Sequence, residues 1–443
     1  MPHKLHRTES DFEARFAALI DAPRAGCDDV RQSVAAILAD VRVHGDAAVI
    51  AHTKHFDRLE LTATTLRIRE AEIDSAVAAC SPEQSAALET AARRITAFHA
   101  RQHPEGLDYH DGEGMRLGSR WTAVDAVGLY VPGGTASYPS SVLMNAIPAK
   151  VAGVGRIVMV VPTPIGRVNA LVLAAARLAG INEIYRIGGA QAVAALAYGT
   201  ATIAPVDKIV GPGNAYVAEA KRQVFGTVGI DMIAGPSEIL VVADAANPPD
   251  WIAADLLSQA EHDTAARAIL VTDDPGFAEQ VMAAVEARLA TLPRAAIAGA
   301  SWREHGLVIV VNHLDEVPPL VNRIAPEHLE LAVSEPDRLF ARVRHAGSVF
   351  LGRHTPEALG DYVAGPNHVL PTSRSARFSS GLSVLDFLKR TTFIEASPAG
   401  LAAIGPAALT LAAAEGLDAH RLSLALRLDA MGAEAGADAG TPP

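Results

Sequence analysis

The sequence predicts an α/β fold with two units, each built around a mainly parallel sheet. Three observations support this prediction. Short β-branched runs alternate with amphipathic helical runs from Trp121 onward, which is typical of βαβ units. Residues 28–102, and the chain after Phe378, show helical periodicity instead. The stretch 230–235, which precedes a new strand, fits a junction between the two units.

The predicted elements are short and closely spaced. Strands are expected at 126–132, 156–162, 183–188, 206–210, 237–243, 268–272, 307–311 and 347–351. Helices are expected near 141–154, 168–180, 190–199, 214–226, 250–263, 275–291, 405–415 and 419–430. Residues 1–10 are polar and are expected to be loose. The Ala-, Gly- and Asp-rich stretch 432–443 is expected to be disordered.

The composition excludes several classes of partner. The chain has 443 residues, of which 49% are hydrophobic and 20% charged, as in a globular protein of two or three domains. Its formal net charge is −12, so it has no basic field for nucleic acid or for an anionic membrane. An anionic cofactor is still allowed, because backbone N–H groups can bind it.

The cysteines and the first residues indicate a cytoplasmic protein. Only Cys27 and Cys80 occur, so a disulfide framework is excluded. The chain begins with polar sequence instead of an apolar signal segment, and it has no uncharged apolar run of about 18 residues. Neither cysteine lies in a segment that resembles a site. A thiol-bound intermediate for aldehyde oxidation would therefore lack its nucleophile.

Polar side chains at 251–263 and 323–331 stand where a core would need apolar ones. A helix would put Gln259 and His262 on one face, as metal ligands on one helix require. Taken alone, that pair fits a solvated helix end better.

Glu327 and His328 follow Pro326, which suits a turn or a helix start, so they are expected at the beginning of an element. An adjacent carboxylate and imidazole can supply two bases with different pKa values. Taken alone, a surface pair beside a helix dipole is the simpler explanation.

Four further polar residues lie in segments that resemble loops or hinges. Asp361 and His368 follow a predicted strand, where α/β sites are usually built. Glu415 and His420 flank a predicted hinge between two helices, and they exceed what helix capping requires.

Two glycine-rich segments, 128–134 and 211–216, each follow a predicted strand and precede a helix. Neither has the G-x-G-x-x-G spacing, so the Rossmann fingerprint is absent. Backbone N–H groups at such helix starts can bind phosphate, but taken alone two ordinary strand–helix turns explain the segments better.

Taken in order, these segments resemble the histidinol dehydrogenase family. The resemblance covers roughly residues 20 to 430, and most of its motifs are long and specific. They are YVPGGTASYPSSVLMNAIPAKVAGV (130–154), GPGNAYVAEAKRQVFGTVGIDMIAGPSEILVVAD (211–244), LLSQAEHD (256–263), RIAPEHLEL (323–331), GDYVAGPNHVLPT (360–372), GLSVLDFLKR (381–390) and EGLDAH (415–420).

The resemblance implies two Rossmann-like α/β domains with parallel-rich sheets, small helical segments at both ends, and an intertwined homodimer. The implied division begins with an N-terminal helical segment (1–25). A first α/β domain (26–129 with 237–380) holds the metal and acid–base residues, and a second α/β domain (130–236) binds NAD. A C-terminal helical dimerisation segment (381–430) and a disordered tail (431–443) complete the chain.

The resemblance also implies one zinc ion per subunit, held by Gln259, His262, Asp361 and His420. In the family this last histidine comes from the partner subunit, so that the two subunits share an active site. Oxygen and imidazole ligands suit Zn²⁺, although Mn²⁺ or Co²⁺ would also fit.

Further roles follow residue by residue. Glu327 and His328 match the family's acid–base pair, and Ser237, His368 and Glu415 match positions that line the substrate pocket. The four metal-holding residues and His328 also match substrate contacts.

Positions that contact NAD⁺ in the family are matched by Tyr130, Gln191 and Asn214. The implied reaction, the last two steps of histidine biosynthesis, is a four-electron oxidation of L-histidinol to L-histidine through bound L-histidinaldehyde and its hydrate. In this reaction His328 would act as base in both steps, and Glu327 would activate water in the second.

Three alternatives differ in testable ways. A related zinc- and NAD-dependent dehydrogenase of a sulfonated diol would keep the metal set and the base pair, but Glu415 and His368 disfavour it because a carboxylate is a poor partner for a sulfonate. A zinc hydrolase would form no NADH. A non-catalytic metal-binding protein would show no turnover.

Overall fold

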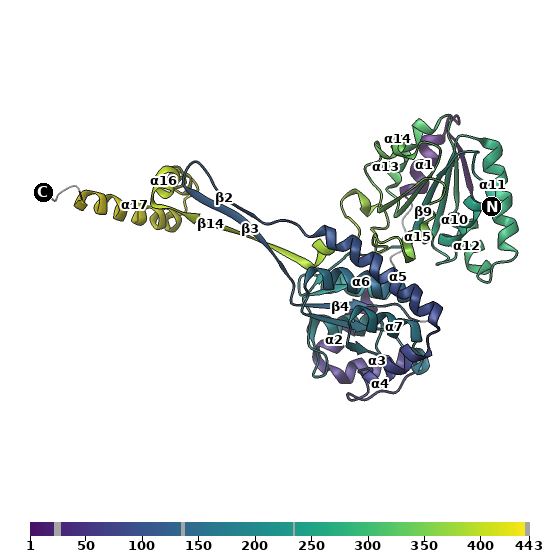
Figure 1. Ribbon diagram of the computed structural model, residues 1–443, viewed down its shortest axis with the longest axis horizontal. Coiled ribbons are helices and arrows are strands. Elements are labelled where there is room, and N and C mark those ends of the chain that lie inside the picture. The colour runs from purple at the N-terminus through teal and green to yellow at the C-terminus, as the bar shows by residue number, and fades with distance from the viewer. Residues whose placement is uncertain (22–27, 134–137, 234, 439–443) are drawn as a thin grey trace. The chain divides into compact units, whose positions relative to one another are not determined.

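The computed structural model describes residues 1–21, 28–133, 138–233 and 235–438 (Figure 1). Cys27 and the last five residues of the predicted tail lie outside the described residues. The chain divides into two compact units, Met1–His103 with Val124–Phe387, and Pro104–Ala123 with Leu388–Pro443. Each unit is described by itself.

A six-stranded sheet forms one half of the first unit. Its neighbouring strands are parallel, in the order β1-β11-β10-β9-β12-β13. The strands are β1 (His3–His6), β9 (Glu238–Ala243), β10 (Arg267–Thr272), β11 (Leu307–Val310), β12 (His328–Ala332) and β13 (Ser348–Leu351). Four of them, β9, β10, β11 and β13, coincide closely with predicted strands, because each is a short run of mostly apolar residues. In β9, β10 and β11 nearly all of these residues are buried.

Two strands of this sheet were not expected. Residues 3–6 pair with β11 instead of being loose, and only Leu5 of β1 is buried, so a single core position left no periodic signal. In β12 all five residues are buried, Glu330 among them, and this charged residue interrupts the apolar run that identifies a buried strand.

Helices cover both faces of the six-stranded sheet. One face packs against α10 (Pro249–Ala260), α11 (Pro275–Leu289) and α12 (Ala295–His305). The other packs against α1 (Phe12–Asp21), α13 (Val317–Ile324) and α14 (Pro336–Phe340). The short helix α15 (Glu357–Tyr362) follows β13 and contacts α10. The prediction of parallel sheets covered by helices is therefore confirmed for this half.

A five-stranded parallel sheet forms the other half of the first unit, in the order β6-β5-β4-β7-β8. Its strands are β4 (Ala126–Tyr130), β5 (Arg156–Val160), β6 (Glu183–Tyr185), β7 (Lys208–Val210) and β8 (Gly229–Ile230). The connecting helices are α6 (Pro139–Ala152), α7 (Ala170–Ala179), α8 (Gly189–Tyr198) and α9 (Ala215–Val224). Each of these four helices lies within a few residues of its predicted range.

The N-terminal helices belong with this second sheet, which differs from the assignment of 26–129 to the domain of 237–380. The helices are α2 (Asp28–His44), α3 (Asp46–Asp57), α4 (Glu70–Ala79) and α5 (Pro82–His99). Val34 and Val41 of α2 share a core with Val158 of β5 and Val193 of α8. An amphipathic helix shows which of its faces is buried but not which sheet it covers, so periodicity could not decide this point.

The second unit joins a three-stranded antiparallel sheet to a helical hairpin. The strands β2 (Leu107–His110), β3 (Met115–Ala123) and β14 (Leu388–Ala396) pair in the order β14-β3-β2, and α16 (Pro398–Ala414) contacts α17 (Asp418–Asp438). The expectation that 381–430 is helical is thus corrected at β14, and helix α17 continues into the segment 431–443 that was expected to be disordered. Within the described residues no helix is long and apolar enough to cross a membrane.

Five short 3₁₀ turns complete the described elements. They are η1 (Ala100–Gln102), η2 (Pro164–Gly166), η3 (Leu314–Glu316), η4 (Ser375–Arg377) and η5 (Val384–Phe387).

Candidate active site

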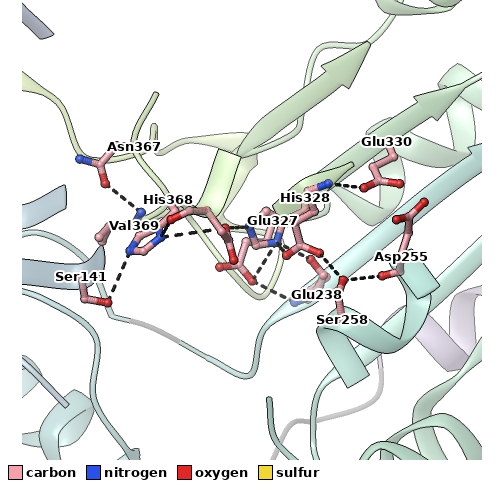
Figure 2. A network of polar contacts seen from close by, with 12 residues as sticks. Ser141, Glu238, Asp255, Ser258, Glu327, His328, Glu330, Asn367, His368 and Val369 are labelled. Atoms are coloured by element: carbon pink, nitrogen blue, oxygen red, sulfur yellow. Dashed lines mark hydrogen bonds and ion pairs between the residues drawn. The ribbon is translucent and has the colours of Figure 1, made fainter. Parts of the chain in front are cut away.

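The predicted acid–base pair lies at the edge of the six-stranded sheet where its strands begin (Figure 2). His328 is the first residue of β12, as the sequence predicted for the start of an element, and Glu238 is the first residue of β9 beside it. The backbone before β12 is fixed because Ser348 N–H donates to Glu327 O at 2.9 Å. Side chains from two neighbouring strands therefore converge at this amino edge.

Glu327 is a buried carboxyl group, 6% exposed. Its Oε2 accepts a hydrogen bond from the Glu238 N–H at 2.9 Å. Burial raises the pKa of Glu327 to about 8, against the opposing effects of His328 and of that hydrogen bond. A carboxylate of such high basicity can take a proton from water near neutral pH.

His328 has one ring nitrogen held and the other available. Its Nδ1 lies 3.0 Å from the carbonyl oxygen of Glu238, which can only accept, and 3.2 Å from Glu357 Oε1. This places the proton of the neutral ring on Nδ1. Buried Nε2 has no hydrogen-bond partner among the described residues. The arrangement leaves Nε2 as a base with a fixed orientation.

A group of potential metal ligands surrounds this base. One ligand atom each from His328, Glu357 and Asp361 lie within 4.8 Å of one another. Asp361 Oδ1 is 3.8 Å from His328 Nε2 and 4.0 Å from His368 Nδ1. Asp361 was expected in a loop, but it lies in α15, which turns its carboxylate toward the start of β12.

Gln259 gives an independent indication of a missing ligand. It is fully buried in the last turn of α10, and neither polar atom of its amide has a partner in the described part of the chain. A buried amide left unsatisfied costs about 1–3 kcal/mol, unless a ligand completes it. The nitrogen and oxygen donors gathered here fit a zinc-like cation.

His262 lies just beyond α10, because that helix ends at Ala260. The turn still brings it near Gln259, since His262 N–H donates to Gln259 O at 3.1 Å. The exposed imidazole of His262 interacts electrostatically with Asp361 and His328. The two predicted ligands therefore lie at one helix end, although not both within the helix.

Two predicted substrate contacts lie close to the same edge. Ser237 directly precedes β9. His368 has Nδ1 at 2.9 Å from Asp361 O and Nε2 at 3.4 Å from Ser141 Oγ of α6. Burial lowers the pKa of His368, so its ring is held neutral near pH 7.

Behind His328 lies a set of acidic residues that sequence reasoning missed. Glu357 N–H donates to Glu330 Oε1 at 2.5 Å, and Ser258 Oγ donates to Glu357 Oε2 at 3.2 Å. Burial raises the pKa of Glu330 and of Glu357 well above the ordinary value, and it raises that of Asp255 to about 6.

A sequence signal for two of these residues did exist. Glu330 stands inside an otherwise apolar run, and Glu357 precedes Asp361 by one helical turn.

The predicted cofactor residues lie elsewhere, at the edge of the five-stranded sheet where its strands end. Tyr130 closes β4, and its hydroxyl accepts from the Gly189 N–H at 3.0 Å. Gln191 lies in the first turn of α8, 1% exposed, and its Oε1 has no partner within the described ranges. Asn214 caps α9 and accepts from Tyr216 N–H at 3.1 Å and from Val217 N–H at 3.2 Å.

The loop that precedes α9 is held by a buried ion pair. Gly211 has φ +114°, and a β-carbon there would lie 2.1 Å from Tyr130 O, so only glycine fits. Lys221 Nζ donates to Gly211 O at 2.9 Å, and Asp231 Oδ2 accepts from Gly211 N–H at 2.7 Å. Lys221 and Asp231 also pair with each other, and both are almost fully buried.

The remaining predicted residues, Glu415 and His420, belong to the second unit. Glu415 caps the end of α16, His420 lies in the first turn of α17, and both side chains are exposed. The first unit by itself thus brings together the other predicted metal and acid–base residues.

Comparisons with known proteins agree on one family. A family model described as histidinol dehydrogenase matches residues 21–428. Histidinol dehydrogenase from Rhodospirillum rubrum is 66% identical over 430 residues, covering 97% of this chain and 99% of the relative. The enzyme of that name from Ruegeria pomeroyi is 64% identical over 429 residues, with the same coverage.

A solved structure gives the same result. The crystal structure of histidinol dehydrogenase from Elizabethkingia anophelis matches with a TM-score of 0.92 at 38% identity, covering 97% of this chain and 99% of that chain.

Proposed function

The chain belongs to the histidinol dehydrogenase family, and on that premise we propose that it oxidises L-histidinol to L-histidine with two NAD⁺, the last steps of histidine biosynthesis. The observation that carries the proposal is the pair Glu327 and His328. It combines an oriented imidazole with a free Nε2 and a carboxyl group whose pKa is raised to about 8. Two bases of different strength suit two successive oxidations of one carbon.

In the first oxidation His328 Nε2 takes the hydroxyl proton of the alcohol while the carbon loses hydride. The contacts of Nδ1 with Glu238 O and Glu357 Oε1 hold the ring in position and stabilise the charge that it gains. General-base help of this kind typically contributes about 10²–10⁴-fold.

In the second oxidation the aldehyde must first add water, because neither cysteine supports a thiol route. Glu327 takes a proton from that water as its oxygen bonds to the aldehyde carbon. The carbonyl oxygen takes back the proton that His328 gained in the first oxidation, which gives the hydrate and leaves Nε2 unprotonated again. His328 then takes the hydrate's hydroxyl proton as the second hydride leaves. The hydrogen bond from Glu238 N–H to Glu327 Oε2 keeps the carboxylate in place.

We assign the metal to Gln259, His262 and Asp361, with His420 of the partner subunit as the fourth ligand. The unpartnered buried amide of Gln259 and the carboxylate of Asp361 support this assignment. A zinc ion bound there would supply a Lewis-acidic clamp for the imidazole and amino nitrogens of the substrate. Ser237, His368 and Glu415 complete the proposed substrate contacts.

The proposed NAD⁺ contacts are Tyr130, Gln191 and Asn214. The glycine at 211 and the helix starts of α8 and α9 allow the backbone to approach an anionic dinucleotide closely. When bound, NAD⁺ supplies the hydride acceptor for both steps.

A homodimer is proposed because the first unit contributes three of the four proposed metal ligands, Gln259, His262 and Asp361. The fourth ligand would be His420 of the partner subunit. The second unit exposes large apolar side chains, with Ile394 72%, Leu411 65% and Leu426 61% exposed. Exposed apolar surface of this kind is typical of a region that a partner covers.

The decisive experiment counts NADH formed per molecule of L-histidinol with zinc present. We expect a value near two. A value near one would instead indicate a dehydrogenase that stops at the aldehyde or acts as a diol dehydrogenase, and no NADH would indicate a hydrolase or a binding protein.

A further inference from the structure

Asp57 is a partly buried carboxylate for which the described residues provide no hydrogen-bonded or ion-paired cation. It is the last residue of α3, and Oδ2 is buried with no hydrogen-bond partner in the described chain. Burial raises the pKa of Asp57. Leaving a carboxylate in this condition is costly, so such a group usually has a ligand or a function.

The position of Asp57 places it beside the proposed NAD⁺ contacts. It is an electrostatic neighbour of Tyr130, yet the two side chains form no direct hydrogen bond in the structure. Two residues further on, Leu59 lies against the loop after β5, since a β-carbon at Gly166 would be 3.5 Å from Leu59 Cδ1. Helix α3 also contacts both α8 and η2.

Two polar groups at Gly189, from Tyr130 and Gln191, and the carboxylate of Asp57 near Tyr130 therefore have hydrogen-bonding capacity that no described residue uses. The Tyr130 hydroxyl accepts from Gly189 N–H, which leaves its own proton to be donated. Gln191 Oε1, which would lie 2.7 Å from a β-carbon at Gly189, is buried and unpartnered among the described residues, as is Asp57 Oδ2. Two acceptors and one donor match a vicinal diol, whose hydroxyl groups both donate and accept.

We propose that Asp57 accepts a hydrogen bond from the 2′-hydroxyl of the adenosine ribose of NAD⁺ and thereby selects NAD⁺ over NADP⁺. This inference rests on the proposed function. The adenosine half is favoured because hydride transfer requires the nicotinamide near His328 of the six-stranded sheet. Asp57 ends α3, whose Ala48 and Val49 belong to the core of the five-stranded sheet instead. Many dinucleotide-binding folds use an acidic residue on this hydroxyl, but there it follows the glycine-rich turn, whereas Asp57 precedes the whole sheet.

The test measures calorimetric dissociation constants of the full-length, zinc-loaded protein for NAD⁺ and NADP⁺. Asp57→Asn keeps the shape of the side chain and removes its charge. We expect the preference for NAD⁺ over NADP⁺ to fall at least about tenfold, because the variant weakens the bond to the hydroxyl and relieves repulsion of the 2′-phosphate.

The matched control is Glu60→Gln, which removes an equal charge three residues away, from a carboxylate that is 80% exposed and paired with Lys54. Its preference should equal that of the wild type. An Asp57→Asn preference within about twofold of the wild-type value would overturn the inference.

A second probe, NAD⁺ lacking the adenosine 2′-hydroxyl, separates a direct contact from an indirect effect. The wild type should bind it about tenfold more weakly than NAD⁺, whereas Asp57→Ala should bind the two almost equally. Equal sensitivity of both proteins to the missing hydroxyl would show that Asp57 does not contact it. Thermal melting confirms that each variant is folded.

The two proposals fail differently. Oxidation of histidinol with NAD⁺ but an unchanged Asp57→Asn preference overturns only the role of Asp57. Absence of dinucleotide binding in the wild type overturns both.

Discussion

The two parallel sheets of the first unit use opposite edges for their sites. The six-stranded sheet gathers ionisable side chains where β9 and β12 begin, and burial raises the pKa of Glu327, Glu330 and Glu357. The five-stranded sheet presents neutral hydroxyl and amide groups where its strands end.

The difference fits the task proposed for each edge. Proton transfer needs buried titratable groups, whereas binding of a dinucleotide needs backbone N–H groups and close approach. The rule that ligands bind at the carboxyl ends of parallel strands thus predicts only one of the two proposed sites.

The largest expected effect comes from replacing His328, the proposed base, which should impair catalysis at one sheet edge but not NAD⁺ binding at the other. His328→Asn should lower kcat for both histidinol and histidinal about 10²–10⁴-fold, because the same Nε2 serves both oxidations. The dissociation constant for NAD⁺, measured by calorimetry, should stay unchanged, since the proposed NAD⁺ contacts lie on the other sheet. The exposed His313→Asn is the control. A comparable loss of NAD⁺ affinity in His328→Asn would contradict the separation.

The next test distinguishes the proposed role of Glu327 from that of His328 at the edge where β9 and β12 begin. Glu327→Gln should slow oxidation of added histidinal about 10²-fold but that of histidinol to the aldehyde less than about threefold, because only the second step needs activated water. Rates are measured by NADH absorbance in single-turnover experiments, with the exposed Glu335→Gln as control.

The pH dependence offers a further check on Glu327. The wild-type aldehyde rate should rise with pH as Glu327 loses its proton, given its raised pKa. Equal losses in both half-reactions of Glu327→Gln would argue against separate roles.

A third test concerns the edge of the five-stranded sheet where its strands end, at the proposed NAD⁺ contacts. Gly211→Ala should weaken NAD⁺ binding about tenfold and leave histidinol affinity unchanged, because the new methyl group would lie 2.1 Å from Tyr130 O. Gly226→Ala is a matched control, since Gly226 also has a positive φ, +102°, but its β-carbon would meet nothing within 4 Å. Equal effects of both variants on NAD⁺ binding would attribute the loss to backbone strain alone.

The smallest expected effect is on stability, and it concerns Glu72, a carboxylate whose pKa is lowered by ion pairing instead of raised by burial. Burial alone would raise the pKa of Glu72, but hydrogen bonds from Arg186 and the Arg69 backbone outweigh it and lower the pKa to about 2. A lowered folded-state pKa stabilises the protein above the ordinary value of 4.5, and the contribution fades as pH falls toward the folded value.

Glu72→Gln should therefore reduce the free energy of unfolding at pH 7 by about 1 kcal/mol, after allowance for solvent screening. Urea titrations at several pH values should show the difference from wild type shrinking between about pH 5 and about pH 3. A difference independent of pH would exclude the charge as its cause.

The sequence was informative where burial was continuous and less so where it depended on tertiary context. Strands such as β9 and β10 could be located because every residue after the first, Glu238 or Arg267, is buried, and all of these except Thr272 are apolar. Strand β1 could not be located, because it is stabilised by pairing with β11, about 300 residues away in the chain.

The site residues show the same limit. Helical spacing brought Gln259 and His262 to one place, but it could not reveal that α10 ends between them. The residues Glu357 and Glu330 were missed because an acidic residue in a first helical turn or inside a strand has ordinary explanations until its burial is known. The raised pKa values are likewise properties of the packed structure.

The pinned loop at Gly211 has a kinetic consequence. Lys221 and Asp231 hold both backbone polar groups of Gly211 in the protein itself, so the proposed binding of NAD⁺ would restrict little additional motion there. Under the proposed reaction, two dinucleotides must enter and leave for every alcohol, while the aldehyde stays at the other sheet. A cofactor site whose loop is already rigid allows NADH to be replaced by NAD⁺ without a slow rearrangement of the loop. The bound aldehyde is then not disturbed between the two oxidations.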